Sequence, residues 1–484
     1  MTGVTLLGLG PGDPNLLTRQ AWELLNTASE VYLRTRQHPT VAGFPVSLRV
    51  NSFDDLYENC GSFDQVYSQI IEQVLELGKR PQGVIYAVPG HPYVAEATSP
   101  EIERQAHQIG LPVRVVDGLS FLDAVFTALK VDPFPQVMLV DALELAASHH
   151  PSFPPSSPAI IAQIYSKAIA SDVKLTLMAV YPDEHPVRLV HGAGTPQIVV
   201  ESIPLFMLDR VQLPGLQTTL YLPPLTKNTS FEAFQEIIAH LRAPEGCSWD
   251  RQQTHRTLRS NLLEETYEVL VALDADDPQA MCEELGDLLL QIVLHAQIAT
   301  EYGEFKMTDI LQGIHTKLVH RHPHVFGDTK LNDVQGILKN WERIKADERA
   351  ANGKREHSVL DGIALALPAL IQAEEYQKRV ARVGFDWPNI QEVAEKLTEE
   401  FKEFHQALDP EQRANEIGDL LFSVVNLARW YDIDAENVLR EANSRFRSRF
   451  TVLEMAARDL GQEVSDFSLS EMNALWEIAK KREK

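Results

Sequence analysis

The sequence predicts a protein of several domains, in which an α/β domain is followed by two related all-α units. Over residues 1–225, short apolar runs alternate with helical patterns, whereas from residue 231 the apolar spacing is almost wholly helical. Within the helical half, one acidic pattern occurs twice. The 484 residues are enough for about two to four domains with ample core.

The amino-terminal domain is expected to span residues 1–225. Apolar runs predict strands at 4–9, 31–33, 84–88, 113–116 and 160–164, and amphipathic patterns predict helices at 16–25 and 63–77. Alternation of this kind favours a sheet covered by helices. Residues 223–230 are rich in proline, threonine and asparagine, which is typical of a linker, and Ser230 is a candidate N-cap for the next helix.

The helical half is expected to divide into units at residues 231–352 and 358–484. Each unit contains E-E-x-x-E, a spacer and E-x-x-D. The residues of the pattern are Glu264, Glu265, Glu268, Glu284 and Asp287 in the first unit, and Glu399, Glu400, Glu403, Glu416 and Asp419 in the second. Trp249 precedes the first pattern and Trp387 the second. Such recurrence indicates duplication of one helical module.

Both acidic patterns point toward phosphate chemistry. Carboxylates three or four residues apart share one face of a helix. Asp287 and Asp419 stand in apolar runs, so we expect helices buried around most of their circumference, where a carboxylate needs a partner. Two such acidic edges would repel unless cations lay between them, and Mg²⁺ takes oxygen ligands while it binds phosphates. A solvated helix face is the alternative, and recurrence argues against it.

Each acidic pattern is followed by two basic residues four positions apart. These are Lys317 and Arg321 in the first unit, and Arg445 and Arg449 in the second. Each pair would form a cationic edge suited to the β- and γ-phosphates of a nucleotide. Ordinary surface charge is the alternative. The histidines at 320, 322 and 324 are more typical of a loop than of a transition-metal site.

Composition excludes several classes of partner. The net charge of −24 argues against nucleic acid polymers and anionic membranes, because either needs a basic surface. Three widely spaced cysteines give no zinc or disulfide framework and favour a reducing compartment. The amino terminus lacks the features of a secretory signal, and Gln291, His295 and Gln297 interrupt the apolar run from Leu288. We therefore expect a cytoplasmic protein without a membrane span.

The helical half resembles the tandem MazG nucleoside triphosphate pyrophosphohydrolases. The resemblance rests on residues 247–250, 262–268, 283–289 and 321–328 for the first repeat and on residues 378–450 for the second. It implies an all-α, Mg²⁺-dependent fold that cleaves NTPs to NMP and pyrophosphate, and it implies a homodimer.

Carried over by position, the MazG resemblance also implies site residues. The metal ligands would be Glu265, Glu268, Glu284 and Asp287 in one unit, and Glu400, Glu403, Glu416 and Asp419 in the other. Glu264 and Glu399 are candidate catalytic residues that orient or deprotonate the attacking water. Both units retain every carboxylate, so the sequence does not say which of them turns over substrate, and base preference is equally open.

The amino-terminal domain resembles a second family. Residues 8–18 form a glycine-rich turn between a strand and a helix, which alone suggests a dinucleotide site, although Pro11 interrupts the glycine spacing. Together with residues 87–92, 115–120 and 184–199, this turn resembles the tetrapyrrole (corrin/porphyrin) methylases. The similarity covers residues 1–222, and the fusion to MazG units resembles proteins of the YabN type.

The methylase resemblance makes S-adenosylmethionine a candidate cofactor. By position, its binding residues would be Pro89, Gly90, His91 and Pro92 in one loop, and Gly118, Leu119 and Ser120 in another. His91 stands where this family usually has aspartate, and Asp117 where it usually has proline, so methyl transfer does not follow from the resemblance.

Three hypotheses of function remain. The leading one is a Mg²⁺-dependent nucleoside triphosphate pyrophosphohydrolase with a methylase-like domain. The second is a regulatory or scaffold protein that binds Mg²⁺–nucleotide without turnover. The third places the main activity in the amino-terminal domain, as an S-adenosylmethionine-dependent methyltransferase.

Overall fold

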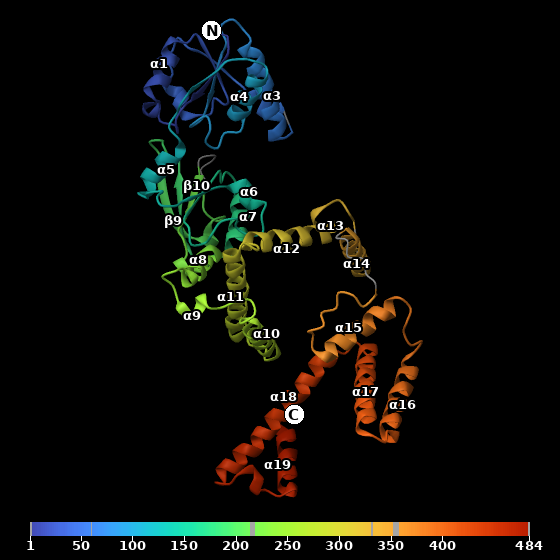
Figure 1. Ribbon diagram of the computed structural model, residues 1–484. Helices are drawn as coiled ribbons and strands as arrows, with labels where there is room; N and C mark the ends of the chain where they lie inside the picture. Colours follow the sequence, from blue (N-terminus) through green and yellow to red (C-terminus); the bar gives the residue numbers. More distant parts are fainter. Residues whose placement is uncertain (1, 60, 213–217, 331–332, 352–357, 483–484) are drawn as a thin grey trace. The chain divides into compact units, whose positions relative to one another are not determined.

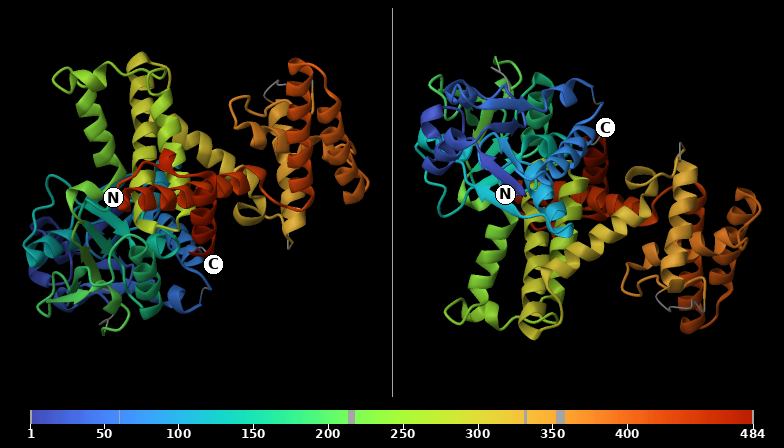
Figure 2. Two further views of the ribbon diagram at one scale, coloured as in Figure 1. Left: turned by 90° about the horizontal axis from the view of Figure 1, so that it is seen from below. Right: turned by 90° about the horizontal axis from the view of Figure 1, so that it is seen from above.

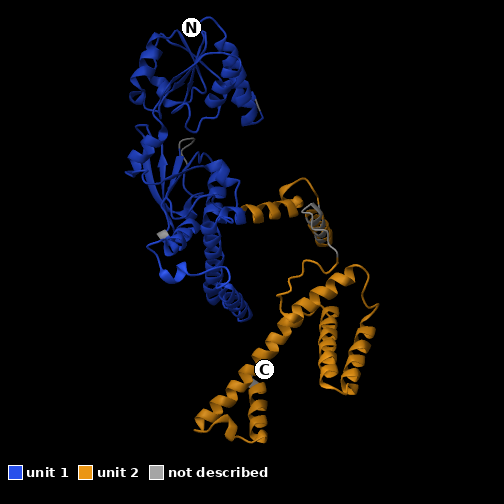
Figure 3. Ribbon diagram, in the orientation of Figure 1, with its two compact units in different colours: residues 1–311 blue, residues 312–484 orange. Residues whose placement is uncertain are grey.

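The structure is a computed structural model that describes residues 2–59, 61–212, 218–330, 333–351 and 358–482 (Figure 1). The chain divides into two compact units, residues 1–311 and 312–484 (Figure 3). The predicted boundary between the two helical repeats, at residues 352–358, falls almost entirely outside the described residues. The three domain ranges expected from the sequence therefore stay predictions.

Five parallel strands form the first sheet, in the order β3-β2-β4-β1-β5. The strands are β1 (Val4–Gly8), β2 (Glu30–Leu33), β3 (Arg49–Ser52), β4 (Val84–Val88) and β5 (Val113–Val116). The helices around it are α1 (Arg19–Thr27), α2 (Asp54–Asn59), α3 (Phe63–Gly78) and α4 (Thr98–Gln108). Leu6 packs with Ile70 and Tyr86 on one face, while Leu7 packs with Leu25 on the other. Successive residues of β1 thus serve opposite faces, and both faces are covered.

Five more strands form a mixed sheet, in the order β6-β7-β10-β8-β9. The strands are β6 (Met138–Asp141), β7 (Ala159–Ala162), β8 (Pro186–His191), β9 (Val199–Pro204) and β10 (Thr218–Leu222). The helices beside it are α5 (Phe121–Leu129), α6 (Ala142–Ala146) and α7 (Lys167–Met178). Strand β6 runs parallel to β7, and the other pairs are antiparallel.

Each predicted strand overlaps an observed one, but the helix predicted at 16–25 begins later. Residues Pro14–Leu16 form a separate 3₁₀ turn, and α1 starts at Arg19. The side chain of Thr18 accepts a hydrogen bond from the backbone N–H of Ala21 and is therefore the N-cap. Apolar periodicity alone does not show that Thr18 caps the helix, and so it predicted a start that was too early.

Glycines allow the loops after β1, β4 and β5 to meet. Gly10 and Gly90 exchange backbone hydrogen bonds of 3.1 and 2.8 Å. A Cβ on Gly8 would lie 2.5 Å from the Gly118 nitrogen, and one on Gly118 would lie 2.3 Å from the Gly90 oxygen. Packing of the loops on one another therefore requires glycine at 8 and 118, whereas at Gly90, where a Cβ would meet no atom within 4 Å, glycine suits the positive φ of 69°.

Helices are the main secondary structure of the described residues from 231 onward. Those before the repeat boundary are α8 (Phe231–Arg242), α9 (Ser248–Arg251), α10 (Arg259–Asp274), α11 (Pro278–Tyr302), α12 (Met307–Arg321), α13 (Pro323–Phe326) and α14 (Val334–Ala351). Those after it are α15 (Ala369–Arg382), α16 (Ile390–Gln406), α17 (Pro410–Trp430), α18 (Ala435–Asp459) and α19 (Leu469–Arg482). Ser230 caps α8, as predicted, by accepting from the N–H of Ala233.

The acidic patterns lie on two helical hairpins, α10–α11 (the first hairpin) and α16–α17 (the second hairpin). In both, the turn ends in an aspartate that caps the second helix, followed by proline at its first position: Asp277-Pro278 and Asp409-Pro410. Figure 2 shows α10 and α11 side by side in both views. The recurrence of this capped turn supports duplication of one module.

The hairpins are more exposed than the sequence led us to expect. Apolar side chains of α11 such as Leu285 (47% exposed) and Ile292 (42%) face solvent, as do Leu421 (52%) and Phe422 (45%) of α17. The prediction that these helices are buried around most of their circumference is therefore wrong for the single chain, because no described element covers these rows. Among the described residues, no helix meets the length and apolarity needed to cross a membrane.

The packing of the glycine loops predicts the effect of Gly8→Ala. The added methyl group would clash with backbone atoms of Gly118 and Gly90, so we expect a loss of about 1–3 kcal/mol in the stability of the first sheet. Hydrogen exchange measured by mass spectrometry should be faster in β1, β4 and β5. Gly61→Ala is the control, because a Cβ there meets only the Gln65 side chain at 3.9 Å. Equal exchange in the two variants would contradict this account.

Candidate functional site

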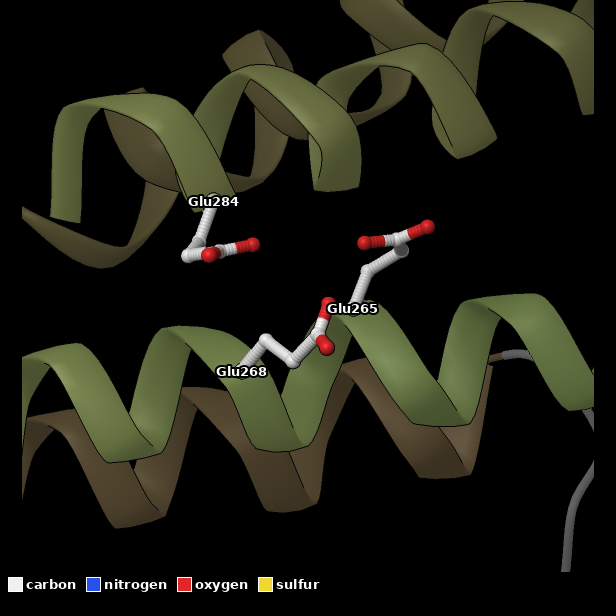
Figure 4. Close-up of side chains that lie close together, drawn as sticks. All are labelled: Glu265, Glu268 and Glu284. Atoms are coloured by element: carbon white, nitrogen blue, oxygen red, sulfur yellow. The ribbon is translucent and has the colours of Figure 1, made fainter. Parts of the chain in front are cut away.

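The first hairpin brings three carboxylates together. Glu265 and Glu268 share one face of α10, and Glu284 faces them from α11 (Figure 4). One oxygen of each lies within 4.8 Å of the others. We call these three residues the first acidic cluster. Asp287, one turn beyond Glu284, lies outside the trio but close enough for its charge to act on it.

Mutual repulsion marks the first acidic cluster. Desolvation, and then the charges of Asp287, Glu268 and Glu264, raise the pKa of Glu265 above its usual value. Desolvation and the neighbouring carboxylates also raise the pKa of Glu284. A cation between the side chains would relieve this repulsion. The donors are all carboxylate oxygens, the ligand type that hard ions such as Mg²⁺ prefer.

The second hairpin forms a similar group. Glu400 of α16 lies with Glu416 and Asp419 of α17, again with one oxygen of each within 4.8 Å of the others, and we call these the second acidic cluster. Glu403 lies outside the trio. Its charge, after desolvation, is the largest cause that raises the pKa of Glu416.

A lysine distinguishes the second acidic cluster from the first. Lys396 Nζ lies 2.9 Å from Glu400 Oε1 and 3.4 Å from Glu399 Oε2. The residue at the matching position before Glu265 is Asn261. In the described part of the chain, the second cluster therefore has an ammonium group within it and the first does not. Lys396 was not predicted as part of the site, although its i, i+4 spacing from Glu400 would have predicted an ion pair between them.

The two glutamates predicted to be catalytic lie beside the clusters. The charge of Glu264 contributes to the raised pKa of Glu265, and Glu399 faces Lys396. Neither contact distinguishes a catalytic base from an outer ligand. Their catalytic role stays a prediction.

Three of the four predicted phosphate-binding residues contact other side chains. Lys317 and Arg321 lie on α12 beyond the division between the compact units, so their relation to the first acidic cluster is not defined. Arg321 Nη2 lies 2.6 Å from Glu348 Oε2 and, with His320, holds the pKa of that carboxyl at about 2. Arg445 pairs with Glu441 at 3.3 Å, and the guanidinium of Arg449 lies over the ring of Trp476. Phosphate binding by all four stays a prediction.

The predicted cofactor loops meet at one edge of the first sheet. Pro89–Pro92 follow β4 and Gly118–Ser120 follow β5, on either side of β1. Ligands of open α/β sheets bind at such carboxyl ends. The Ser120 hydroxyl accepts from the Leu122 N–H in the capping box of α5, so helix capping already uses this group.

The two departures from the methylase pattern face each other. His91 Nε2 lies 3.6 Å from Asp117 Oδ1, and the Tyr93 backbone N–H donates to His91 Nδ1. The imidazole therefore faces the carboxylate across the two loops, and its Nδ1 is already used as an acceptor. The sequence pointed to both positions but not to their contact.

Known families match all three parts of the chain. Residues 3–207 match the tetrapyrrole (corrin/porphyrin) methylases, residues 253–326 match the MazG nucleotide pyrophosphohydrolase domain, and residues 368–446 match phosphoribosyl-ATP pyrophosphohydrolase. The second helical repeat thus matches a different pyrophosphohydrolase model from the first.

Relatives cover the whole chain or its helical half. YabN of Bacillus subtilis is 41% identical over 99% of both chains. The nucleoside triphosphate pyrophosphohydrolase/pyrophosphatase MazG of Thermotoga maritima is 43% identical over 52% of this chain and 95% of its own length. The nucleoside triphosphate pyrophosphohydrolase of Escherichia coli K12 is 43% identical over 51% of this chain and 95% of its own. The chain therefore belongs to the MazG nucleotide pyrophosphohydrolase family, and it carries a tetrapyrrole methylase-type domain before its two helical repeats.

Proposed function

We propose that the chain is a Mg²⁺-dependent nucleoside triphosphate pyrophosphohydrolase, which converts an NTP and water to NMP and pyrophosphate. The observation that carries the proposal is the convergence of three carboxylates on each of two hairpins. The names of the relatives from Thermotoga maritima and Escherichia coli support the same activity.

The side chains suit this reaction. In the first hairpin, Glu265, Glu268, Glu284 and Asp287 would hold Mg²⁺, and in the second Glu400, Glu403, Glu416 and Asp419 would do so. A bound ion would neutralise the triphosphate and lower the pKa of a coordinated water. Glu264 or Glu399 would orient the attacking water and accept its proton.

Attack of the water oxygen on the α-phosphorus forms one P–O bond and breaks the bond to the oxygen that bridges the α- and β-phosphates. Negative charge then collects on the leaving pyrophosphate. Lys317 and Arg321, or Arg445 and Arg449, would neutralise it. A scaffold that binds Mg²⁺–nucleotide without turnover is the rival function, and it predicts binding without release of pyrophosphate.

We further propose that the chain acts as a homodimer. The apolar rows on both hairpins, which include Leu285, Ile292, Leu421 and Phe422, face solvent in the single chain. Extended apolar surface of this kind is typical of a surface covered by a partner. A second copy would cover the same rows on both chains.

A second candidate function concerns the amino-terminal domain. We propose that the loops at Pro89–Pro92 and Gly118–Ser120 bind S-adenosylmethionine, supported by their place at the carboxyl ends of β4 and β5. Because His91 and Asp117 join these loops, binding would have to part or bypass this contact.

Loss of one ligand should remove turnover from the repeat concerned. We expect Glu268→Gln or Glu403→Gln to lower pyrophosphate release at its own hairpin by at least about 100-fold, since Mg²⁺ contributes several kcal/mol to stabilising the transition state. A panel of NTPs with Mg²⁺ measures this, and loss in one variant alone assigns turnover to one repeat. Glu283→Gln, which removes one charge from α11 outside the cluster, is the control. Full turnover in a variant that carries both Glu268→Gln and Glu403→Gln would contradict the proposal.

Magnesium binding should weaken in acid. The pKa values of Glu265, Glu284 and Glu416 are raised, so protons compete with Mg²⁺ at a higher pH than for ordinary glutamates. Affinity is expected to be full well above these raised values and to fall as pH falls toward the usual glutamate value of about 4.5. Calorimetric Mg²⁺ titrations at pH about 7.5 and about 5.5 test this. Equal affinity at both would argue against carboxylate ligands.

Removal of the side-chain contact between the cofactor loops should strengthen the binding of S-adenosylmethionine. His91→Ala removes the imidazole that faces Asp117 but keeps the backbone of the loop, through which binding is proposed, so we expect tighter binding than in the unaltered chain. Calorimetry with S-adenosylmethionine measures both, and His107→Ala, which alters an exposed histidine of α4, is the control. No binding by either protein at millimolar ligand would remove this candidate function.

A further inference from the structure

A pair of nearly coplanar imidazoles, edge to edge, joins the two helices of the first hairpin. His255 lies in the turn before α10, and His295 lies on α11. Their Nδ1 atoms are 2.7 Å apart, and their ring planes differ by 8°. A contact this short is a hydrogen bond, so one Nδ1 must donate and the other must accept.

The surroundings of the pair assign its protons. Both Nε2 atoms are buried without a hydrogen-bond partner, but His255 Nε2 lies 3.4 Å from Glu304 Oε2, whose negative charge favours a proton there. We therefore place N–H at His255 Nε2, so that His255 Nδ1 accepts from the N–H at His295 Nδ1. His295 Nε2 then carries no proton, and it is buried without a hydrogen-bond partner.

Any further proton disturbs this arrangement. Three protons on four ring nitrogens leave one nitrogen bare. If that nitrogen is His295 Nε2, both Nδ1 atoms carry N–H groups that face each other at the bonding distance. If it is any other nitrogen, an N–H group is buried at His295 Nε2 without an acceptor, which is costly.

The lowered pKa of His295 agrees with a neutral imidazole pair. Burial, and then the charge of His255, lowers the pKa of His295. Since the folded chain holds the neutral form more firmly than the unfolded chain does, the contact contributes its full stability above the unfolded value of 6.5. This contribution is lost as pH falls below that value.

Other charged groups lie near the contact between His255 and His295, but they do not take part in the hydrogen bond between the two imidazoles. Arg242, at the end of α8, binds Glu301 through contacts of 2.8 and 2.7 Å and donates to the carbonyl oxygens of Asp250 and Gln253 in the turn. This ion pair lowers the pKa of Glu301, so it stays charged well below neutral pH. The arginines at 256 and 259 on the same segment are exposed to solvent. Among the described carboxylates, Glu304 is the one that lies within ion-pair distance of an imidazole of the pair.

The second hairpin has no equivalent. His295 stands eight residues after Asp287 on α11, and the residue eight positions after Asp419 on α17 is Leu427. A leucine neither donates, accepts nor titrates. Any sensitivity to protons that arises from the imidazole pair therefore belongs to the first hairpin alone.

We propose that His255 and His295 form a proton-sensitive positioning contact, which holds the start of α10 against α11 at neutral pH and releases it in acid. Glu265 and Glu268 of α10 would then lose their alignment with Glu284 before the second acidic cluster changes. The consequence for metal binding rests on the proposed function, but the release itself does not.

Hydrogen exchange on the full chain without nucleotide or metal tests the release. Protection of residues 253–300, corrected for intrinsic exchange, is compared with that of residues 390–430 at pH about 7 and about 5. We expect a loss of protection in the first segment relative to the second in the unaltered chain. An unchanged ratio between the segments would overturn the proposal.

Two variants separate titration from general weakening. His295→Leu installs the residue of the second hairpin, and His295→Gln keeps a polar side chain that does not titrate. In each, we expect the ratio of protection to be the same at both pH values, whatever its level. A loss in acid as large as that of the unaltered chain would overturn the proposal. Because no turnover is measured, failure here would leave the hydrolase proposal intact, and an inactive chain would still report on the contact.

Discussion

Repulsion between carboxylates on paired helices is the constraint around which the helical half is organised. Glu265 and Glu284 come from different helices, and desolvation together with neighbouring carboxylates raises the pKa of both. The aspartate-capped turns at Asp277 and Asp409 set the helices antiparallel and so bring the acidic edges together. A counter-charge such as a Mg²⁺–triphosphate would relieve this repulsion.

The two hairpins answer this constraint differently. In the second, Lys396 supplies an ammonium group to Glu400. In the first, the histidine pair ties α10 to α11 at a distance from the carboxylates. The two hairpins thus share the same pattern of carboxylates but differ in their surroundings. Two such sites would respond differently to pH and to metal concentration, which one hairpin alone would not allow.

Local pattern predicted much of the fold and part of the site. Apolar runs found β1, β4 and β5, and the E-x-x-E spacing found the carboxylates that converge. Three features that it missed are the Thr18 cap that delays α1, the facing of His91 and Asp117, and the hydrogen bond between His255 and His295. The last two depend on tertiary contacts. Apolar periodicity also predicted burial for α11, because a sequence shows that a residue is apolar without showing whether its own chain or a partner covers it.

The most direct test of the central claim is hydrolysis of an NTP in water enriched in ¹⁸O, with Mg²⁺ present, followed by mass spectrometry of both products. Attack at the α-phosphorus places the heavy oxygen in the NMP and leaves pyrophosphate unlabelled. Label in inorganic phosphate or pyrophosphate, or no products above a blank without protein, would contradict the assignment of the acidic clusters to NTP pyrophosphohydrolysis.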